Sequence, residues 1–182
     1  MRWLVLALCG AAICTVCDHL HATHGVLWYA HPVVWDQAWW VPLLFAGASL
    51  AAVGGATPVR RLLGARNPPP PTAREVAGDG LAFITAYAYT SFAPADRPNV
   101  TLALLAAWWL ARVVRGRAGW LVVYSLLTAA AGTLFEAGWS ALGFFAYHHP
   151  DFLGVPRWLP GIYLHVALVA GPLERALRGA DA

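Results

Sequence analysis

Charge is scarce in this sequence, and lysine is absent. Asp, Glu, Lys and Arg make up 12% of the 182 residues, about half of the roughly 25% found in soluble domains. Hydrophobic residues make up 59%, and mean hydropathy is +0.57. This composition excludes a disordered chain and an ordinary cytosolic enzyme, and a net charge of +3 is too dilute for a nucleic acid partner. We expect one integral membrane domain, residues 1–182.

Cysteine is also rare, and its position excludes a disulfide framework. Cys9, Cys14 and Cys17 all lie in the first apolar segment, where an odd number of thiols acts as small buried hydrophobic groups. The segment lacks the small-residue cleavage site of a signal peptide. We therefore expect it to be retained as the first membrane span.

Six apolar stretches are long enough to cross a bilayer, which takes about 20 residues. They are residues 2–20, 39–59, 75–92, 99–114, 119–146 and 158–176. The third begins with Glu75 and Asp79, which the positive end of the helix dipole can stabilise. The fifth is long, so it should tilt or project beyond the hydrocarbon. The sequence thus predicts an all-α membrane protein with six transmembrane helices and no convincing internal repeat.

The arginines predict the orientation. With the N-terminus inside, the inner segments hold ten of the twelve arginines, and the outer segments hold only Arg97 and Arg157. The positive-inside rule then places both termini in the cytoplasm. Arginine in place of lysine, with abundant alanine, is typical of a GC-rich bacterial genome, so we expect a bacterial inner membrane.

Four segments, in order, resemble the insulin-induced gene (Insig) family of small membrane proteins. They are AWWVP at residues 38–42, TLAL at 101–104 with Trp108 and Trp109 after it, RGRAG at 115–119, and YHHPDFL at 147–153 followed by RWLP at 157–160. The third corresponds to a basic Arg-Ser-Arg-Ser-Gly turn in the family. The resemblance covers about residues 36–178.

This resemblance implies a six-helix, non-enzymatic protein whose helices surround a lipid-accessible pocket. In animals the family binds oxysterols, retains the escort protein Scap in the endoplasmic reticulum, and presents HMG-CoA reductase for degradation. By motif alignment, the family's pocket threonine falls on Thr101 and a pocket phenylalanine on Phe83. Two positions depart from the family: Val114 replaces an Asp that Scap binding requires, and Arg97 replaces a pocket glutamine. The first departure argues against a Scap-type partner.

Glu136 lies midway along the fifth predicted span, where an ionisable group should face protein or water. At helical spacing it belongs to a small and polar stripe that should be the interior face: Ser125, Thr128, Gly132, Glu136, Ser140 and Gly143. One interpretation makes Glu136, with Ser140 and Thr101, the site for a lipid hydroxyl or ester. The other makes Glu136 an interhelical hydrogen-bonding group in a closely packed interface.

Histidines gather in the predicted outer loops at His19, His21, His24 and His31, with His148 and His149 in the last one. Their spacing fits interfacial packing as well as coordination, so we expect no specific metal and no cofactor. The alternatives are a small membrane enzyme that uses Glu136 and this histidine cluster on a lipid, and a structural subunit without ligand.

We expect a non-enzymatic protein that holds a neutral lipid in an intramembrane cavity. Diacylglycerol, a phospholipid, a polyisoprenoid or a sterol-like molecule could occupy it. Small residues at Gly47, Ala51, Gly54 and Gly55 predict close packing of the second span with another helix or subunit, so a homo-oligomer is also expected.

Overall fold

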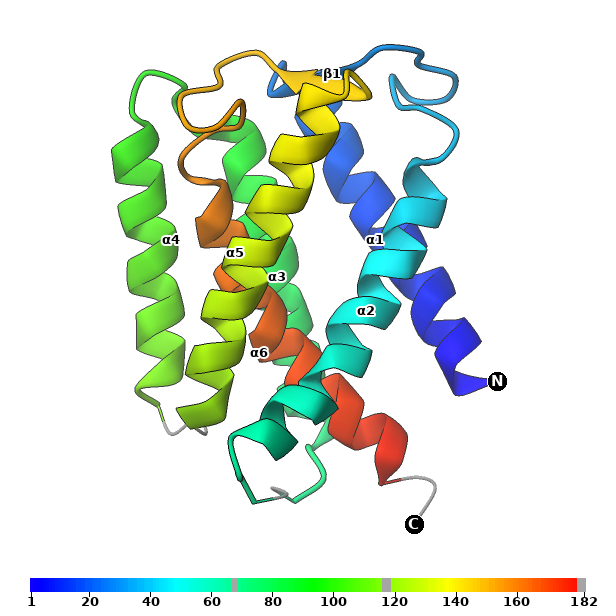
Figure 1. Cartoon of the computed structure of the whole chain (residues 1–182), viewed down its shortest axis with the longest axis vertical. Coiled ribbons are helices and arrows are strands. Elements are labelled where there is room, and N and C mark those ends of the chain that lie inside the picture. Colours follow the sequence, from blue (N-terminus) through cyan, green and yellow to red (C-terminus); the bar gives the residue numbers. More distant parts are fainter. Residues whose placement is uncertain (67–68, 116–118, 180–182) are drawn as a thin grey trace.

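Six helices make up most of the computed structural model, which describes residues 1–66, 69–115 and 119–179. They are α1 (Arg2–Thr23), α2 (Val41–Leu62), α3 (Ala73–Phe92), α4 (Pro98–Val113), α5 (Gly119–Ala141) and α6 (Leu159–Arg178). Pro68 of the proline run and residues 116–118 of the basic turn lie outside the described residues. The helices run between an upper end, which carries a small sheet, and a lower end, where α1 begins and α6 ends (Figure 1).

Each of the six predicted stretches contains one helix. Three of them, α1, α2 and α5, are long and apolar enough to cross a membrane. The predicted extension of the fifth span to residue 146 is wrong, because α5 ends at Ala141. Gly143 follows in the left-handed region, with φ +78°, and the amide of Phe144 donates back to the Trp139 carbonyl. This is a Schellman ending, so the chain leaves the helix before the aromatic residues that extend the apolar run.

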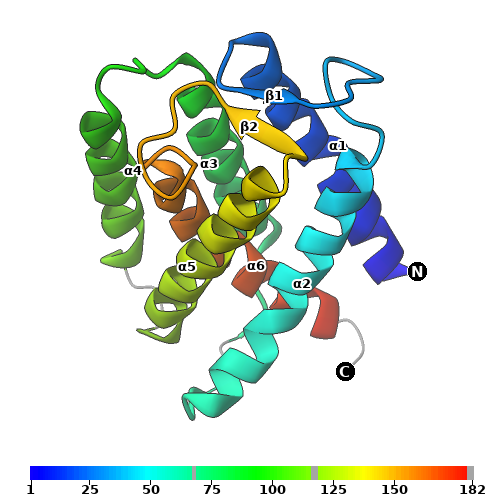
Figure 2. The ribbon, with the colours of Figure 1, turned by 45° about the horizontal axis from the view of Figure 1, so that its top comes forward.

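The upper end carries a sheet of two short strands that the sequence did not predict. β1 (Leu27–Tyr29) follows α1, and β2 (Phe145–Tyr147) follows α5. The strands pair in antiparallel fashion and lie across the tops of the helices (Figure 2). Their side chains alternate in burial, as expected for a strand with one buried face.

The sheet joins two copies of one structural unit, α1-β1-α2 and α5-β2-α6. The first helix of each copy ends at a left-handed glycine, Gly25 or Gly143. Each strand is followed by a tight turn closed by an isolated bridge, Val34 to Gln37 in one copy and Phe152 to Val155 in the other. The same backbone hydrogen bonds recur around both turns.

The strand register has the symmetry of a twofold axis. Leu27 pairs with Tyr147, Tyr29 with Phe145, and Trp28 with Ala146 at the centre. Tyr29 and Tyr147 are equivalent in the two units, as are Leu27 and Phe145, so exchanging the units returns the same pairing. The prediction of no internal repeat is therefore wrong. The two units share backbone geometry far more than side chains, so the repeat leaves only short paired motifs in the sequence.

Two buried ion pairs join helices. Arg60 of α2 bonds to Glu174 of α6 at 2.9 Å, and Arg112 of α4 bonds to Asp79 of α3 at 2.8 Å. The Arg112 guanidinium also donates to His165 Nδ1 at 2.6 Å. The buried carboxylate of Asp79 is thus stabilised by an ion pair and not by the helix dipole alone. At the start of α3, Glu75 instead forms a capping box with Thr72.

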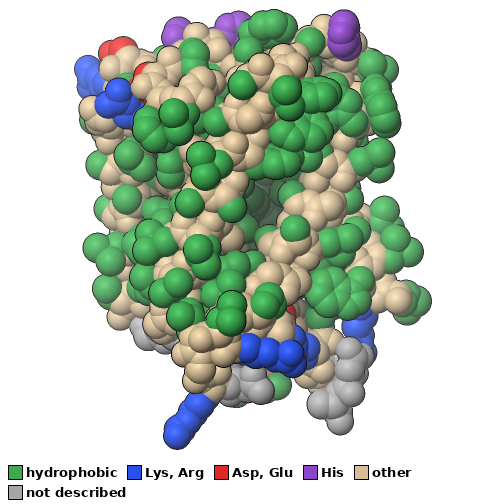
Figure 3. Space-filling model, viewed as in Figure 1, with side chains coloured by type: hydrophobic (Ala, Val, Ile, Leu, Met, Phe, Trp, Pro, Cys, Tyr) green, Lys and Arg blue, Asp and Glu red, His purple; other side chains and the backbone are tan. Residues whose placement is uncertain are grey.

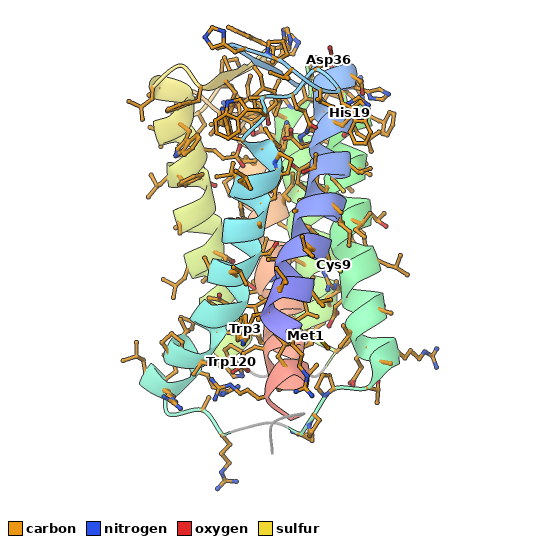
Figure 4. All side chains as sticks on the ribbon, turned by 90° about the vertical axis from the view of Figure 1, so that its right-hand side faces the viewer. Met1, Trp3, Cys9, His19, Asp36 and Trp120 are labelled. Atoms are coloured by element: carbon orange, nitrogen blue, oxygen red, sulfur yellow. The ribbon has the colours of Figure 1, made fainter. Side chains whose placement is uncertain are left out.

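Several aromatic and polar residues lie toward the two ends of the molecule. Trp3 and Trp120 lie toward the lower end, and His19 and Asp36 lie at the upper end (Figure 4). Charged side chains likewise gather at the ends, while the middle of the visible face is mostly hydrophobic (Figure 3). This distribution is typical of a protein surrounded by lipid.

Candidate functional site

A cavity of about 1340 Å³ lies among the helices. Five helices contribute to its wall, whereas no described residue of α4 does. The space-filling view is hollowed between α2 and α5 at mid-height (Figure 3). The cavity therefore opens sideways, through the part of the molecule that carries the apolar surface.

Small side chains create the opening. The α2 wall includes Gly47, Ala48 and Ala51, and the α5 wall includes Ala131 and Gly132. A methyl group at Gly47 would meet nothing within 4 Å, so the space beside this helix is open. The small-residue face predicted for close packing of the second span thus borders the cavity over part of its length.

Glu136 provides one polar group at the upper end of this cavity. Both of its carboxyl oxygens accept hydrogen bonds from tyrosine hydroxyls, one from Tyr147 of β2 and one from Tyr163 of α6. Gly132 lies one turn below, and a side chain there would overlap the Tyr163 ring. The small stripe on α5 therefore allows Tyr163 to approach closely enough to reach Glu136.

Asp18 provides a second carboxyl group, at the equivalent position of the first unit. It is buried, and its Oδ2 accepts from the Tyr29 hydroxyl and from the Gln37 amide, both at 2.6 Å. Its Oδ1 faces the Tyr87 hydroxyl at 3.4 Å. Like Glu136, Asp18 lines the cavity, so two carboxyl groups face the same space.

The repeat explains why the two carboxyl groups meet. In each unit the acid lies eleven residues before the tyrosine that bonds to it, Asp18 before Tyr29 and Glu136 before Tyr147. Burial raises the pKa of Tyr29 and of Tyr147 above the usual value. Both phenols therefore keep their protons at neutral pH and act as donors to the carboxyl groups.

His21 completes this end of the cavity. Its ring is 1% exposed, lies with its centroid 4.6 Å from that of Tyr87, and lines the cavity. Nε2 lies 2.9 Å from the Thr90 hydroxyl. Among the described residues, no group lies within hydrogen-bonding distance of Nδ1. We call the following set the polar end of the cavity: Asp18, His21, Tyr29, Tyr87, Glu136, Tyr147 and Tyr163.

The structure brings together two of the four predicted site residues. Phe83 and Glu136 both line the cavity. Thr101 does not, because α4 packs against α6 on the side away from the cavity; its buried hydroxyl donates to the Arg97 carbonyl at 3.4 Å. Ser140 does not either, because its hydroxyl turns to the Gly154 carbonyl in the loop before α6. Their placement in one site with Glu136 is corrected accordingly.

Sequence reasoning missed the other members of the polar end, although a signal for some of them was present. Tyr-x-His-Pro occurs at residues 29–32 and again at 147–150, and Trp-x-Pro occurs at residues 40–42 and 158–160. These paired motifs mark the repeat. With it, Asp18 and Tyr29 could have been placed beside Glu136 and Tyr147. Nothing comparable marks Tyr87 or Tyr163.

Three of the other histidines, His19, His24 and His165, have roles in packing. His19 bonds to the Trp35 carbonyl at 2.9 Å, and His24 bonds to the Leu20 carbonyl at 2.8 Å. His165 is fully buried and has a partner on each ring nitrogen. In the described ranges, no group of three or more His, Cys, Asp or Glu side chains could hold a metal ion. His21 and His24 make separate contacts, His21 with Thr90 and His24 with the Leu20 carbonyl.

Comparison with known proteins finds a relative in sequence and a solved structure with the same fold. The chain is 30% identical to insulin-induced gene 1 protein of Danio rerio, over 97% of this chain and 72% of the relative. It also matches the crystal structure of the Insig homologue MvINS of Mycobacterium vanbaalenii, with a TM-score of 0.80 and 26% identity over 100% of this chain and 96% of the other. A cross-linked trimer of MvINS matches equally well. No protein-family model matches.

Proposed function

Because this chain belongs to the Insig family, we propose that it is a non-enzymatic membrane protein that holds a neutral lipid in its cavity. The observation that carries the proposal is the cavity itself, an apolar space of about 1340 Å³ with one polar end. A lipid with a small polar head and long apolar chains has the same division of chemistry. Diacylglycerol and sterol-like lipids both fit this description.

The sideways opening supports entry of the ligand from the bilayer. Lipid can pass between α2 and α5 without its chains crossing water, since the surface beside the opening is apolar. A binding role also fits Glu136. Tyrosine hydroxyls donate to both of its oxygens and hold the carboxyl group in place, and each carboxylate oxygen keeps a second lone pair that can accept from a lipid hydroxyl.

We further propose that all six helices cross the membrane, with both termini in the cytoplasm of a bacterium. The start of α1 and the end of α6 lie toward one end of the molecule (Figure 1), as an even number of crossings requires. Two of the arginines counted for the inner side, Arg60 and Arg112, are buried within helices, where they are paired with acids. The other arginines still favour this orientation.

The assembly proposed for this chain is a homo-oligomer, since the related MvINS has been crystallised as a cross-linked trimer. Gly54 of α2 offers a surface with no atom within 4 Å of an added methyl group. The mass of the purified protein in detergent tests this. The Scap-type escort role is not extended to this chain, because Val114, at the exposed end of α4, replaces the family's Asp.

The lipid proposal is tested by filling the cavity from one side. Both Ala130 and Ala131 are exposed on α5, but only Ala131 lines the cavity. Ala131→Trp should therefore lower the lipid that remains bound after purification in mild detergent, measured by mass spectrometry per mole of protein. Ala130→Trp should leave bound lipid at the wild-type level. Equal lipid content in both variants would contradict binding in this cavity.

A further inference from the structure

The polar end of the cavity holds two acidic side chains that lie far from the arginines. Asp18 and Glu136 both line the cavity, and among the described residues of its lining Arg2 is the only arginine. Arg2 starts α1 at the lower end of the molecule, whereas Asp18 lies near the end of the same helix (Figure 1). Almost the whole length of α1 therefore separates the arginine from the polar end.

The partners of these two acids also differ from those of the other buried acids. Glu174 and Asp79 each bond to an arginine, at 2.9 Å and 2.8 Å. Asp18 instead accepts from tyrosine hydroxyls and a glutamine amide, and Glu136 accepts from two tyrosine hydroxyls. Each of these uncharged partners donates its hydrogen bond, as an ionised carboxylate requires.

His21 is the one basic side chain in the polar end, and its contacts keep it neutral. The Thr90 hydroxyl donates its proton to the Tyr87 carbonyl at 2.7 Å, so it accepts from His21 Nε2, which lies 2.9 Å away. Nδ1 is buried, and no group of the described residues lies within hydrogen-bonding distance of it. A second proton there would be a buried charge without an acceptor, which is costly. His21 therefore does not compensate the acids.

The two carboxyl groups lie close enough to act together. The Tyr29 hydroxyl donates to Asp18, and the Tyr147 hydroxyl donates to Glu136. Both tyrosines belong to the buried face of the sheet. Tyr29 pairs with Phe145, so Tyr147 is its diagonal neighbour, and such neighbours lie about 7–8 Å apart. A headgroup beside one carboxylate is thus within the electrostatic range of the other.

We infer that Asp18 and Glu136 exclude lipids with an anionic headgroup from the cavity. Charges at this separation interact strongly in a protein interior, so both carboxylates repel a phosphate or sulfate at the polar end. The repulsion acts through space and needs no contact, which suits Asp18 at 3% exposure. An uncharged hydroxyl can instead donate to the remaining carboxylate lone pairs. The inference rests on the proposed lipid-binding function and adds the headgroup class that the cavity rejects.

The test compares lipids that differ only in an anionic group. Tritiated 1,2-dioleoylglycerol, bound to wild-type protein in a mild non-ionic detergent, is displaced by unlabelled 1,2-dioleoylglycerol or by its 3-phosphate. Tritiated cholesterol is displaced by cholesterol or by cholesterol 3-sulfate in the same way. In each pair whose neutral member binds, we expect the anionic member to require at least about a tenfold higher concentration, as repulsion by two nearby charges predicts.

The double variant Asp18→Asn with Glu136→Gln removes both charges and nearly preserves the shapes of the side chains. Its preference for the neutral lipid should fall towards one, mainly because the anionic lipid now binds. Asp96→Asn is the control, since it removes one charge from an exposed acid outside the cavity lining, and it should keep the wild-type preference. If the two acids were purely structural, the double variant would bind both lipids more weakly with an unchanged preference, and that result would overturn the inference.

The wild-type protein alone also decides the inference. Equal competition by the neutral and the anionic lipid would overturn it and leave lipid binding in the cavity intact, whether the anionic group lies beside the acids or beside Arg2 at the other end. Failure of both tritiated lipids to bind would overturn the proposed function and this inference together.

Discussion

Glu174 shows how single charged residues are stabilised inside this protein. It is 2% exposed and bonds to Arg60, which is 3% exposed. Thr57 and Arg178 also donate to it. Three donors from two helices thus surround one carboxylate, and the charges are compensated only while all partners are present.

Removing this carboxylate should be strongly destabilising. Glu174→Leu would leave the Arg60 guanidinium buried without its counter-ion, which costs about 3–5 kcal/mol. The double variant Arg60→Met with Glu174→Leu should recover most of that loss, because it removes both charges. Unfolding of the protein in mixed micelles, followed by circular dichroism, measures both changes.

The control for this cycle is an exposed pair. Asp96 and Arg97 lie 3.7 Å apart with 77% and 70% of their side chains exposed, so Asp96→Asn should change stability by less than about 1 kcal/mol. A Glu174→Leu variant as stable as Asp96→Asn would show that the buried pair contributes little.

Only some residues of the site could be predicted from the sequence. Glu136 stood out because an acid within an apolar helix needs a partner, and the structure gives it two tyrosines. Asp18 did not stand out in the sequence. It lies at the end of an apolar run, where an acidic residue is typical of a loop. Its burial depends on Gln37 and Tyr29, which approach it only after the chain has turned back through β1.

At the scale of elements, Gly132 is the position where helix packing and the site depend on each other. A side chain there would overlap the Tyr163 ring, and Tyr163 donates to Glu136. Close approach of α5 and α6 is therefore what holds the second carboxyl group in its hydrogen-bonded position.

Gly132→Ala should consequently lower stability by about 1–3 kcal/mol, as overpacking in a well-packed interior does. It should also lower bound lipid, because Tyr163 must move away from Glu136. Gly138→Ala is the matched control, since it lies on the same helix with nothing within 4 Å of the added methyl group. That control should be neutral or slightly stabilising. Identical melting temperatures for the two variants would contradict the close contact.

The helices were predictable because apolar length and helix formation coincide in a membrane. Each predicted stretch contains a helix, and the largest boundary difference is at α5. There the aromatic run 144–147 is apolar enough to extend a span, but Gly143 turns the backbone out of the helix. The strands were not predictable from hydropathy, since three residues of β1 or β2 carry too little periodicity. Their pairing is long-range and became visible only in the fold.

For the whole molecule, the proposed topology makes a direct prediction. His31 is exposed in the loop between β1 and α2, at the end that carries the sheet, and Arg66 is exposed just after α2, which ends toward the lower end (Figure 1). A cysteine introduced as His31→Cys should react with a membrane-impermeant maleimide in intact cells. One introduced as Arg66→Cys should react only after permeabilisation.

The unchanged chain, with its own Cys9, Cys14 and Cys17 in α1, gives the background for this labelling. Labelling of Arg66→Cys in intact cells, or labelling of both variants there, would rule out six crossings with cytoplasmic termini.

The twofold relation between α1-β1-α2 and α5-β2-α6 bears on how the protein arose. It is the arrangement that duplication and fusion of a hairpin gene would produce, starting from a homodimer. A homodimer presents identical groups from both sides, so every mutation appears twice in its cavity. Fusion removes that constraint: the first unit now has His21 and Gln37 where the second has Trp139 and Val155. A scaffold of symmetric origin can in this way evolve a pocket for a molecule that has no symmetry.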